Sequence, residues 1–310
     1  MGETIRSDAN YEQSLEMDFF LQMVLSGVML GSVYSLVALG FVVIYKSSGV
    51  INFAQGHLLA LGALILWTFW VALGLPIWLG ALLAIMLNGL IGVIIEHLTI
   101  RPLTGQPLMA VIVMTIGLAA FLASLMPCVF GAVEQAYPSI FPVGGLRIFR
   151  LIVSYEYLFS FLMALGMVGI FLYFFHRTKL GLLMRAVADG HDSARSCGVK
   201  VGIIFRWTWA IASISAMVGG FLLGSIASVS PSMTYIGMRV FPVVILGGLD
   251  SITGCIIAGP IVGVLELLAT GYGDPITHGG AGDVMPYIII LLTLVFKPRG
   301  LFGEKEIERI

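Results

Sequence analysis

Long apolar segments are the feature that most constrains the fold of this chain. Most of them hold the roughly twenty residues that an α-helix needs to cross a bilayer at about 1.5 Å of rise per residue. They cover residues 19–45, 57–74, 77–100, 108–130, 153–175, 204–228, 252–271 and 284–297. A shorter apolar piece, 240–249, precedes the seventh. The pattern predicts an all-α, polytopic helical membrane protein with about eight transmembrane segments.

The composition agrees with this class. Of the 310 residues, 59% are hydrophobic and only 11% are charged, whereas soluble domains carry about 25% charged residues. A net charge of −1 argues against a nucleic-acid partner. The three cysteines are scattered and indicate neither a disulfide framework nor a metal site. We expect a flexible polar tail over 1–18, one membrane domain over 19–304 that includes a cytoplasmic loop over 177–203, and a cytoplasmic tail over 305–310.

A basic loop sets the predicted orientation. Residues 177–203 hold five of the sixteen Lys and Arg residues, and positive residues favour the cytoplasmic side of short loops. Counting back from this loop places the acidic N-terminus outside and Lys46 and Arg101 inside. Counting forward through eight full crossings places the basic C-terminus outside, which conflicts with the rule. The conflict predicts a broken or re-entrant segment near 239–251, which enters from outside, breaks at Gly247–Ser251 and returns.

Two polar breaks in apolar sequence are candidates for the translocation path. Residues 38–62 and 239–263 share a plan of an apolar run, a polar break and a helix of small residues, and interrupted segments of this kind mark transport pathways. Chance similarity between glycine-rich segments is the alternative. The candidate path residues are Asn52, Gln55, Gly56 and His57 in the first break and Gly247, Gly248, Asp250 and Ser251 in the second. For the first break, a polar helix end at the membrane interface is the alternative, with Asn52 as N-cap; for Asp250, we favour capping of the next helix.

The basic loop also predicts a short cytoplasmic helix over 190–197. Asp189 is a good N-cap, Asp192 follows three residues later, and Gly198 suits the left-handed position after a helix end. An ordinary solvated connector is the alternative. A doubly capped helix is more structure than a connector requires, so we expect this loop to contact a cytoplasmic partner.

No catalytic motif is present in the sequence. It contains no G-x-x-x-x-G-K-[ST] phosphate-binding loop, no G-x-S-x-G elbow and no H-E-x-x-H metal motif. The chain is therefore predicted not to be an enzyme and to need no cofactor or metal. Glu96, Glu156 and Glu266 lie in apolar segments, where ionisable residues are functional candidates. They leave an ion-coupled secondary transporter open as an alternative.

The sequence resembles a known transporter family at several places. Asp192-Ser193-Ala194 followed by Gly198 is similar to the E-A-A-x-x-x-G signature of ABC importer permeases, with Asp in place of Glu. GSVYSLVALGFVVIYKSSGVINFAQGHLLALGA (31–63), ILGGLDSITGCIIAGPIVGVLE (245–266) and FKPRGLFGE (296–304) resemble segments of LivH-type branched-chain amino-acid permeases. The resemblance covers about residues 19–304.

This resemblance implies a permease subunit of an ATP-driven importer in the inner (plasma) membrane. Branched-chain amino acids are the implied substrate, with urea or short amides as the alternative. The implied partners are a second permease subunit, two ABC ATPase subunits that supply the ATP hydrolysis, and an extracytoplasmic binding protein. The residues that would couple the chain to the ATPase are Arg185, Asp189, Asp192, Ala194, Arg195 and Gly198.

Overall fold

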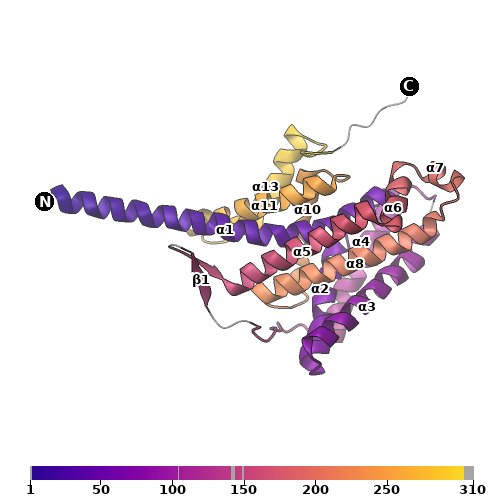
Figure 1. Ribbon diagram of the computed structural model, residues 1–310, viewed down its shortest axis with the longest axis horizontal. Coiled ribbons are helices and arrows are strands. Elements are labelled where there is room, and N and C mark those ends of the chain that lie inside the picture. The colour runs from indigo at the N-terminus through magenta and orange to yellow at the C-terminus, as the bar shows by residue number, and fades with distance from the viewer. Residues whose placement is uncertain (1, 104, 141–143, 149, 304–310) are drawn as a thin grey trace.

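The computed structural model describes residues 2–103, 105–140, 144–148 and 150–303, and helices dominate it (Figure 1). The longer helices are α1 (Gly2–Ser48), α2 (Gln55–Trp67), α3 (Ile77–Ile95), α4 (Leu108–Phe130), α5 (Tyr155–Arg177), α8 (Val201–Ile226), α11 (Ile252–Leu268) and α13 (Ala281–Phe296). The shorter ones are α6 (Lys179–Asp189), α7 (His191–Ser196), α9 (Met233–Met238), α10 (Val240–Gly247) and α12 (Asp274–Thr277). Helical turns of other types extend α2 over Thr68–Ala72, α3 over Glu96–Leu103 and α11 over Ala269–Gly273.

The prediction of an all-α polytopic membrane protein is confirmed. Within the part of the chain that the structure describes, seven helical segments are long and apolar enough to cross a membrane. Met233–Gly247 and Ala281–Phe296 are shorter apolar helices, and they correspond to the predicted break and to the eighth predicted segment. The sequence did not predict the small antiparallel hairpin of β1 (Gly145–Ile148) and β2 (Leu151–Ser154), which precedes α5.

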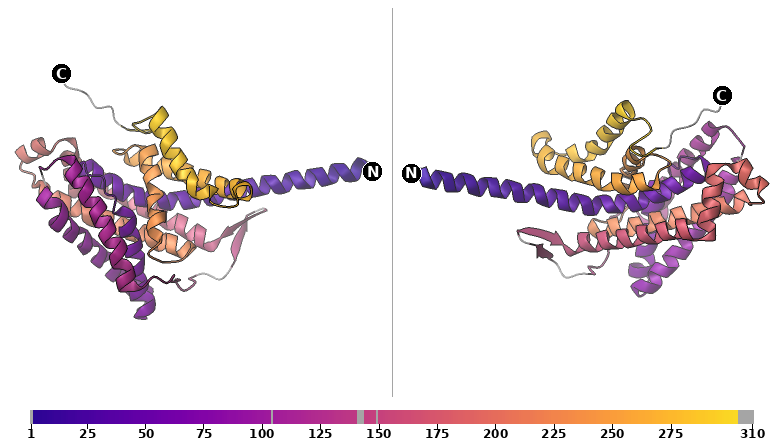
Figure 2. Two further views of the ribbon diagram at one scale, coloured as in Figure 1. Left: turned by 180° about the vertical axis from the view of Figure 1, so that it is seen from behind. Right: turned by 45° about the horizontal axis from the view of Figure 1, so that its top comes forward.

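Helix α1 is the axis of the bundle. Figures 1 and 2 show α11 and α13 on one side of it and α3 and α8 on the other. The polar segment that we expected to be a tail is, from Gly2 on, the beginning of α1 in the structure. Neither glycine nor proline interrupts residues 3–26, and acidic side chains are favourable near a helix N-terminus. Whether these turns are flexible stays a prediction, and the predicted C-terminal tail over 305–310 lies outside the described residues.

Small residues bring α1 and α11 into close contact. Gly27 and Gly31 of α1 face Gly259 and Gly263 of α11, and each pair is spaced as in a G-x-x-x-G motif. A Cβ atom on Gly31 would lie 2.2 Å from the carbonyl oxygen of Gly259, and one on Gly263 would lie 2.3 Å from that of Gly27. Backbones approach this closely only where side chains are absent. The two helices are therefore in direct backbone contact over the stretch that these four glycines cover.

The contacts between helix ends show how the C-terminal third runs. At one end of the bundle, Lys46 Nζ donates to the carbonyl oxygen of Asp250 at 3.3 Å. At the other end, the rings of Phe19 and Tyr272 meet edge to face at a centroid distance of 5.4 Å. Helices α9 and α10 therefore lead to the Lys46 end, and α11 returns to the Phe19 end.

The predicted break is thus present, but it lies at the Lys46 end of the bundle, which is opposite to the end from which it was expected to turn back. Gly248 follows α10 with a φ of +107°, and the chain reverses into α11. The helical segment Met233–Gly247 is shorter than a full span. It can reach this end because most residues of its second half, α10, are buried inside the protein. Leu301 and Phe302 donate backbone hydrogen bonds to Leu246 and Gly247 at 2.7 and 3.1 Å, so the segment after α13 also lies at the Lys46 end. This arrangement removes the charge conflict at the C-terminus.

Candidate functional site

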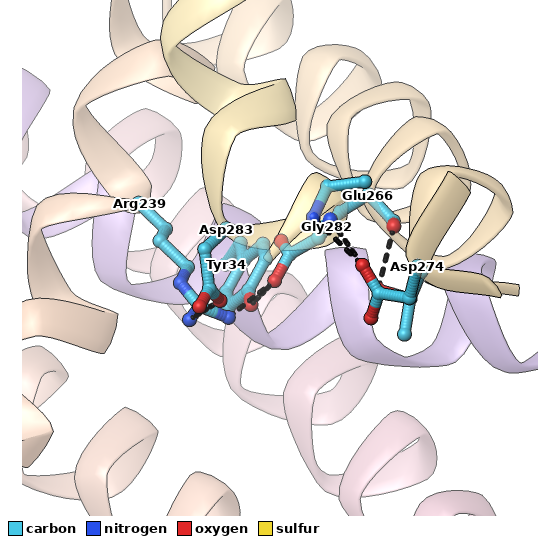
Figure 3. A network of polar contacts seen from close by, with 8 residues as sticks. Tyr34, Arg239, Glu266, Asp274, Gly282 and Asp283 are labelled. Atoms are coloured by element: carbon cyan, nitrogen blue, oxygen red, sulfur yellow. Dashed lines mark hydrogen bonds and ion pairs between the residues drawn. The ribbon is translucent and has the colours of Figure 1, made fainter. Parts of the chain in front are cut away.

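Arg239 joins α9 to α10, and its guanidinium bridges carboxylates from two other helices (Figure 3). Its Nη1 lies 2.5 Å from Oε1 of Glu266 in α11, and its Nη2 pairs with Asp283 in the first turn of α13. The hydroxyl of Tyr34 in α1 donates to the same Glu266 oxygen at 3.2 Å. One network therefore connects α1, the α9–α10 junction, α11 and α13.

This network lies beside a cavity of about 300 Å³. Among the described residues that line the cavity, Arg239 supplies the one cation, and Glu266, Asp274 and Asp283 supply three carboxylates. Oδ1 of Asp274 accepts from the backbone N–H groups of Ala281 and Gly282, at 2.7 and 3.4 Å, and so caps the start of α13. The apolar part of the wall is formed by Leu30, Leu223, Ile226, Ile236 and Leu267. The cavity lining thus combines an excess of carboxylates with aliphatic side chains.

The first polar break is buried against α8 and α9. Asn52 and Gln55 are 0% and 3% exposed, and they are joined by a hydrogen bond from Asn52 Nδ2 to Gln55 Oε1 at 3.1 Å. Gln55 Nε2 donates to the carbonyl oxygen of Ala212 in α8 at 3.2 Å. The N-cap of α2 is Ala54 rather than the predicted Asn52, whose Oδ1 instead accepts from the Ala54 N–H in the turn before the helix.

A small cavity of about 90 Å³ opens beside this break. Asn52, Gln55 and Gly56 line it, together with Gly237 and Phe241 from the α9–α10 segment. Gly56 and Gly237 are in backbone contact, since a Cβ on Gly237 would lie 2.2 Å from the Gly56 Cα. The first break therefore meets the α9–α10 segment upstream of the second break. The half-buried His57 is not among the residues that line this cavity.

The second break packs against other partners. A Cβ on Gly247 would lie 2.6 Å from the backbone of Gly254 and Cys255, and one on Gly248 would lie 2.7 Å from the Gly303 nitrogen. Ser251, not the predicted Asp250, is the N-cap of α11, and its Oγ accepts from the Gly254 N–H at 3.0 Å. Asp250 precedes this cap, and its backbone carbonyl oxygen accepts the hydrogen bond from Lys46. The role of both breaks in a translocation path stays a prediction.

The predicted coupling region forms two helices instead of one. Thr178 caps α6, and its Oγ1 accepts from the Gly181 N–H at 3.0 Å. Arg185 of α6 donates to the carbonyl oxygen of Phe175 and lies 5.5 Å from the centroid of the Phe175 ring. These contacts hold α6 against the end of α5.

Helix α7 corresponds to the predicted short helix, with one difference at its start. Asp189 is the last residue of α6 and Gly190 precedes α7 without a side-chain cap, so the predicted capping box does not form. Gly198 has the expected left-handed conformation, with a φ of +83°. Asp192 and Arg195 are exposed and 3.9 Å apart, whereas Ala194 is buried. His191 Nε2 lies 2.8 Å from the carbonyl oxygen of Ser47, which ties α7 to the end of α1.

The remaining membrane carboxylates do not join the cavity of Arg239. Glu96 is 1% exposed, at the junction of α3 with its last turns, and Glu156 lies in the first turn of α5. Among the described residues, no group of three or more His, Cys, Asp or Glu side chains could hold a metal ion. Neither observation provides a catalytic centre.

Sequence reasoning noted Glu266 but missed its partner Arg239. The signal was available, because Arg239 is the only Lys or Arg between Arg206 and Lys297 and lies within apolar sequence. A charge in such a place calls for a partner of opposite sign inside the bundle. Tyr34 and Asp283 gave no comparable signal, since their role depends on how α1 and α13 pack.

Helices long enough to span a bilayer, a broken segment and buried charges around a cavity define the class: a multi-pass membrane protein of the transporter type. The sequence comparison gives the particular family. Residues 23–294 match the family described as the branched-chain amino acid transport system permease component, and the chain belongs to this family.

Relatives of known name cover nearly the whole chain. The high-affinity branched-chain amino acid transport system permease protein LivH of Salmonella typhimurium is 29% identical, over 94% of this chain and 98% of its own. The corresponding permease protein BraD of Pseudomonas aeruginosa is also 29% identical, over 95% and 99%. A solved structure of PsaBC from Streptococcus pneumoniae in complex with Fab has a TM-score of 0.48 and 13% identity, over 94% of this chain and 96% of that one.

Proposed function

We propose that this chain is the membrane-spanning permease subunit of an ATP-driven importer for branched-chain amino acids in the inner (plasma) membrane. The observation that carries the proposal is the family match over residues 23–294. Relatives named as high-affinity branched-chain amino acid permeases align over almost their full length, which supports the same substrate class here. ATP hydrolysis belongs to partner subunits, since the chain has no phosphate-binding loop.

The proposed assembly holds a second permease subunit, two cytoplasmic ATPase subunits and an extracytoplasmic binding protein. Helices α6 and α7 are the proposed contact with the ATPase, because the side chains of Asp192, Ser193 and Arg195 are exposed at the end of the bundle that carries Lys46. The single hydrophobic side chain that α7 buries is that of Ala194, which leaves the polar face open to a partner.

The attachment of α7 suggests how nucleotide-driven movement would reach the membrane helices. The His191 contact with the Ser47 carbonyl links α7 to α1, and Arg185 links α6 to α5. Helix α1 in turn packs against α11 through the glycine contacts. A displacement of α7 by the ATPase would therefore move α1. Through its contact with α11, α1 would in turn move the helices that carry the network of Arg239.

Transport by the purified assembly tests this function. The chain is expressed with the proposed partner subunits from the same organism, purified as a complex and reconstituted into vesicles that contain ATP. We expect uptake of tritiated leucine that requires ATP and the binding protein and survives collapse of sodium and proton gradients. Uptake that follows an ion gradient in the absence of ATP would show that the chain is a secondary transporter. Selective uptake of urea would show that the substrate is urea and not a branched-chain amino acid.

A further inference from the structure

We propose that the cavity beside Arg239 binds the ammonium group of the transported amino acid, with the aliphatic side chain along the apolar wall. This inference rests on the proposed function and assigns a substrate contact within the permease itself. The cavity lies between α1, α5, α8, α9, α11 and the start of α13, and its volume is about 300 Å³.

The buried carboxylate of Glu266 has one oxygen without a hydrogen-bond partner among the described residues. Glu266 is 3% exposed, and its Oε1 already accepts from Arg239 and Tyr34. Among the described residues, none donates a hydrogen bond to its Oε2, although this atom is buried and the residue lines the cavity. A buried charged oxygen without a donor is costly, so this position favours a ligand that brings N–H groups.

Negative charges outnumber positive charges among the described residues that line the cavity. Arg239 is the one cation among the described residues that line the cavity, and three carboxylates line it as well. Asp274 is partly compensated by the backbone N–H groups at the start of α13. Glu266 and Asp283 share the single guanidinium, which leaves an excess negative charge. An ammonium group supplies the missing positive charge and three donors at once.

The cavity also has an aliphatic lining. Leu30, Leu223, Ile226, Ile236 and Leu267 line the same cavity as the charged residues. An aliphatic side chain gains free energy by leaving water for such a wall, whereas an inorganic cation gains nothing from it. The combination of a carboxylate pair and aliphatic residues therefore favours a hydrophobic amino acid over a metal ion.

Binding to the assembled transporter without its binding protein tests the proposal directly. Bound tritiated leucine is measured on the purified complex, with isoamylamine and 4-methylpentanoate as competitors; each keeps the aliphatic chain of leucine but only one end group. We expect isoamylamine to compete and 4-methylpentanoate not to compete. The reverse order would overturn the proposal.

Substitution of the carboxylates gives the second measurement. Glu266→Gln keeps the size and the acceptor oxygen for Tyr34 but removes the charge, and we expect the Kd for leucine to rise at least about tenfold. Asp283→Asn, at a carboxylate whose side chain is 69% exposed, should raise it by a smaller factor and tests the site even if the Glu266 variant assembles poorly. Glu96→Gln is the matched control, because Glu96 is also buried with an unpartnered Oε2 but lies outside the cavity.

The outcomes separate this inference from the proposed function. Wild-type leucine uptake together with unchanged leucine binding in both cavity variants would overturn the cavity assignment and leave the function standing. Absence of ATP-driven leucine uptake by the wild type would remove the function itself. Binding measured in sodium, potassium and N-methylglucamine chloride identifies an inorganic occupant: if Glu266→Gln changes only the response to sodium or potassium, the site holds a metal cation and the proposal is wrong.

Discussion

At the scale of single residues, two kinds of contact between helices hold this bundle together. Glycines let α1 and α11 touch through their backbones, and Arg239 holds two carboxylates from helices that follow it in the chain. Inside a membrane there is no hydrophobic driving force between helices, so close packing and polar contacts contribute most of their association. Both the glycine contact and the ion pairs of Arg239 can be tested by substitution.

The first test concerns the glycine contact. Gly31→Ala places a Cβ 2.2 Å from the Gly259 carbonyl oxygen, so the helices must separate. We expect a loss of about 1–3 kcal/mol in stability, as for overpacked cores, measured as a lower thermal midpoint of the complex in detergent. Gly166→Ala in α5 is the control, because nothing lies within 4 Å of its added Cβ. Equal midpoints for both variants would show that the glycine contact is not needed.

The second test concerns Arg239. Arg239→Met leaves Glu266 buried without its cation, which should destabilise the protein by about 3–5 kcal/mol. The double variant Arg239→Met with Glu266→Met removes the stranded charge, and we expect it to recover most of the thermal midpoint. If the double variant is no more stable than the single one, the ion pair does not account for the loss.

At the scale of elements, α6 and α7 are the helices that we propose to contact the ATPase. The turn after α7 is fixed by Gly198, whose φ of +83° is unfavourable for a β-branched residue. The glycine therefore determines how α7 is presented and where the chain enters α8.

A substitution at this turn tests the coupling role. Gly198→Val should cost about 1–3 kcal/mol locally and reduce co-purification of the ATPase subunits while the chain still inserts into the membrane. Gly202→Val is the matched control, since Gly202 lies in the first turn of α8 with open space around it and no positive φ. Unchanged ATPase association in the Gly198 variant would contradict the coupling role.

The sequence was informative about elements and less so about their caps and contacts. Apolar length predicted the spanning helices, and Gly198 predicted the end of α7, because both signals are local. The caps at Asp189 and Asp250 were wrong, since neighbouring positions gave equally plausible helix starts and packing selected between them. The contact of Arg239 with Tyr34, Glu266 and Asp283 depends on long-range packing, which local patterns do not encode.

At the scale of the whole molecule, the helix ends define two faces. One carries Lys46, α7 and the turn at Gly248–Ser251, and the other carries Phe19, the β1–β2 hairpin and Tyr272. The positive-inside rule assigns the first face to the cytoplasm. The C-terminal third then crosses inward through α9–α10, outward through α11 and inward again through α13.

Single cysteines in a variant without Cys128, Cys197 and Cys255 test this topology. Ser232→Cys and Thr277→Cys, at exposed positions before α9 and at the end of α12, should react with an impermeant thiol reagent added outside intact cells. Thr253→Cys, exposed at the start of α11, should react only when the cytoplasmic face is opened, as should Ser193→Cys in α7. Short apolar helices can cross here because α10 packs against α11 and the C-terminal segment instead of lipid. Labelling of Thr253→Cys from outside would instead make the α9–α10 segment re-entrant from the outer face and return the basic C-terminus to its conflict with the positive-inside rule.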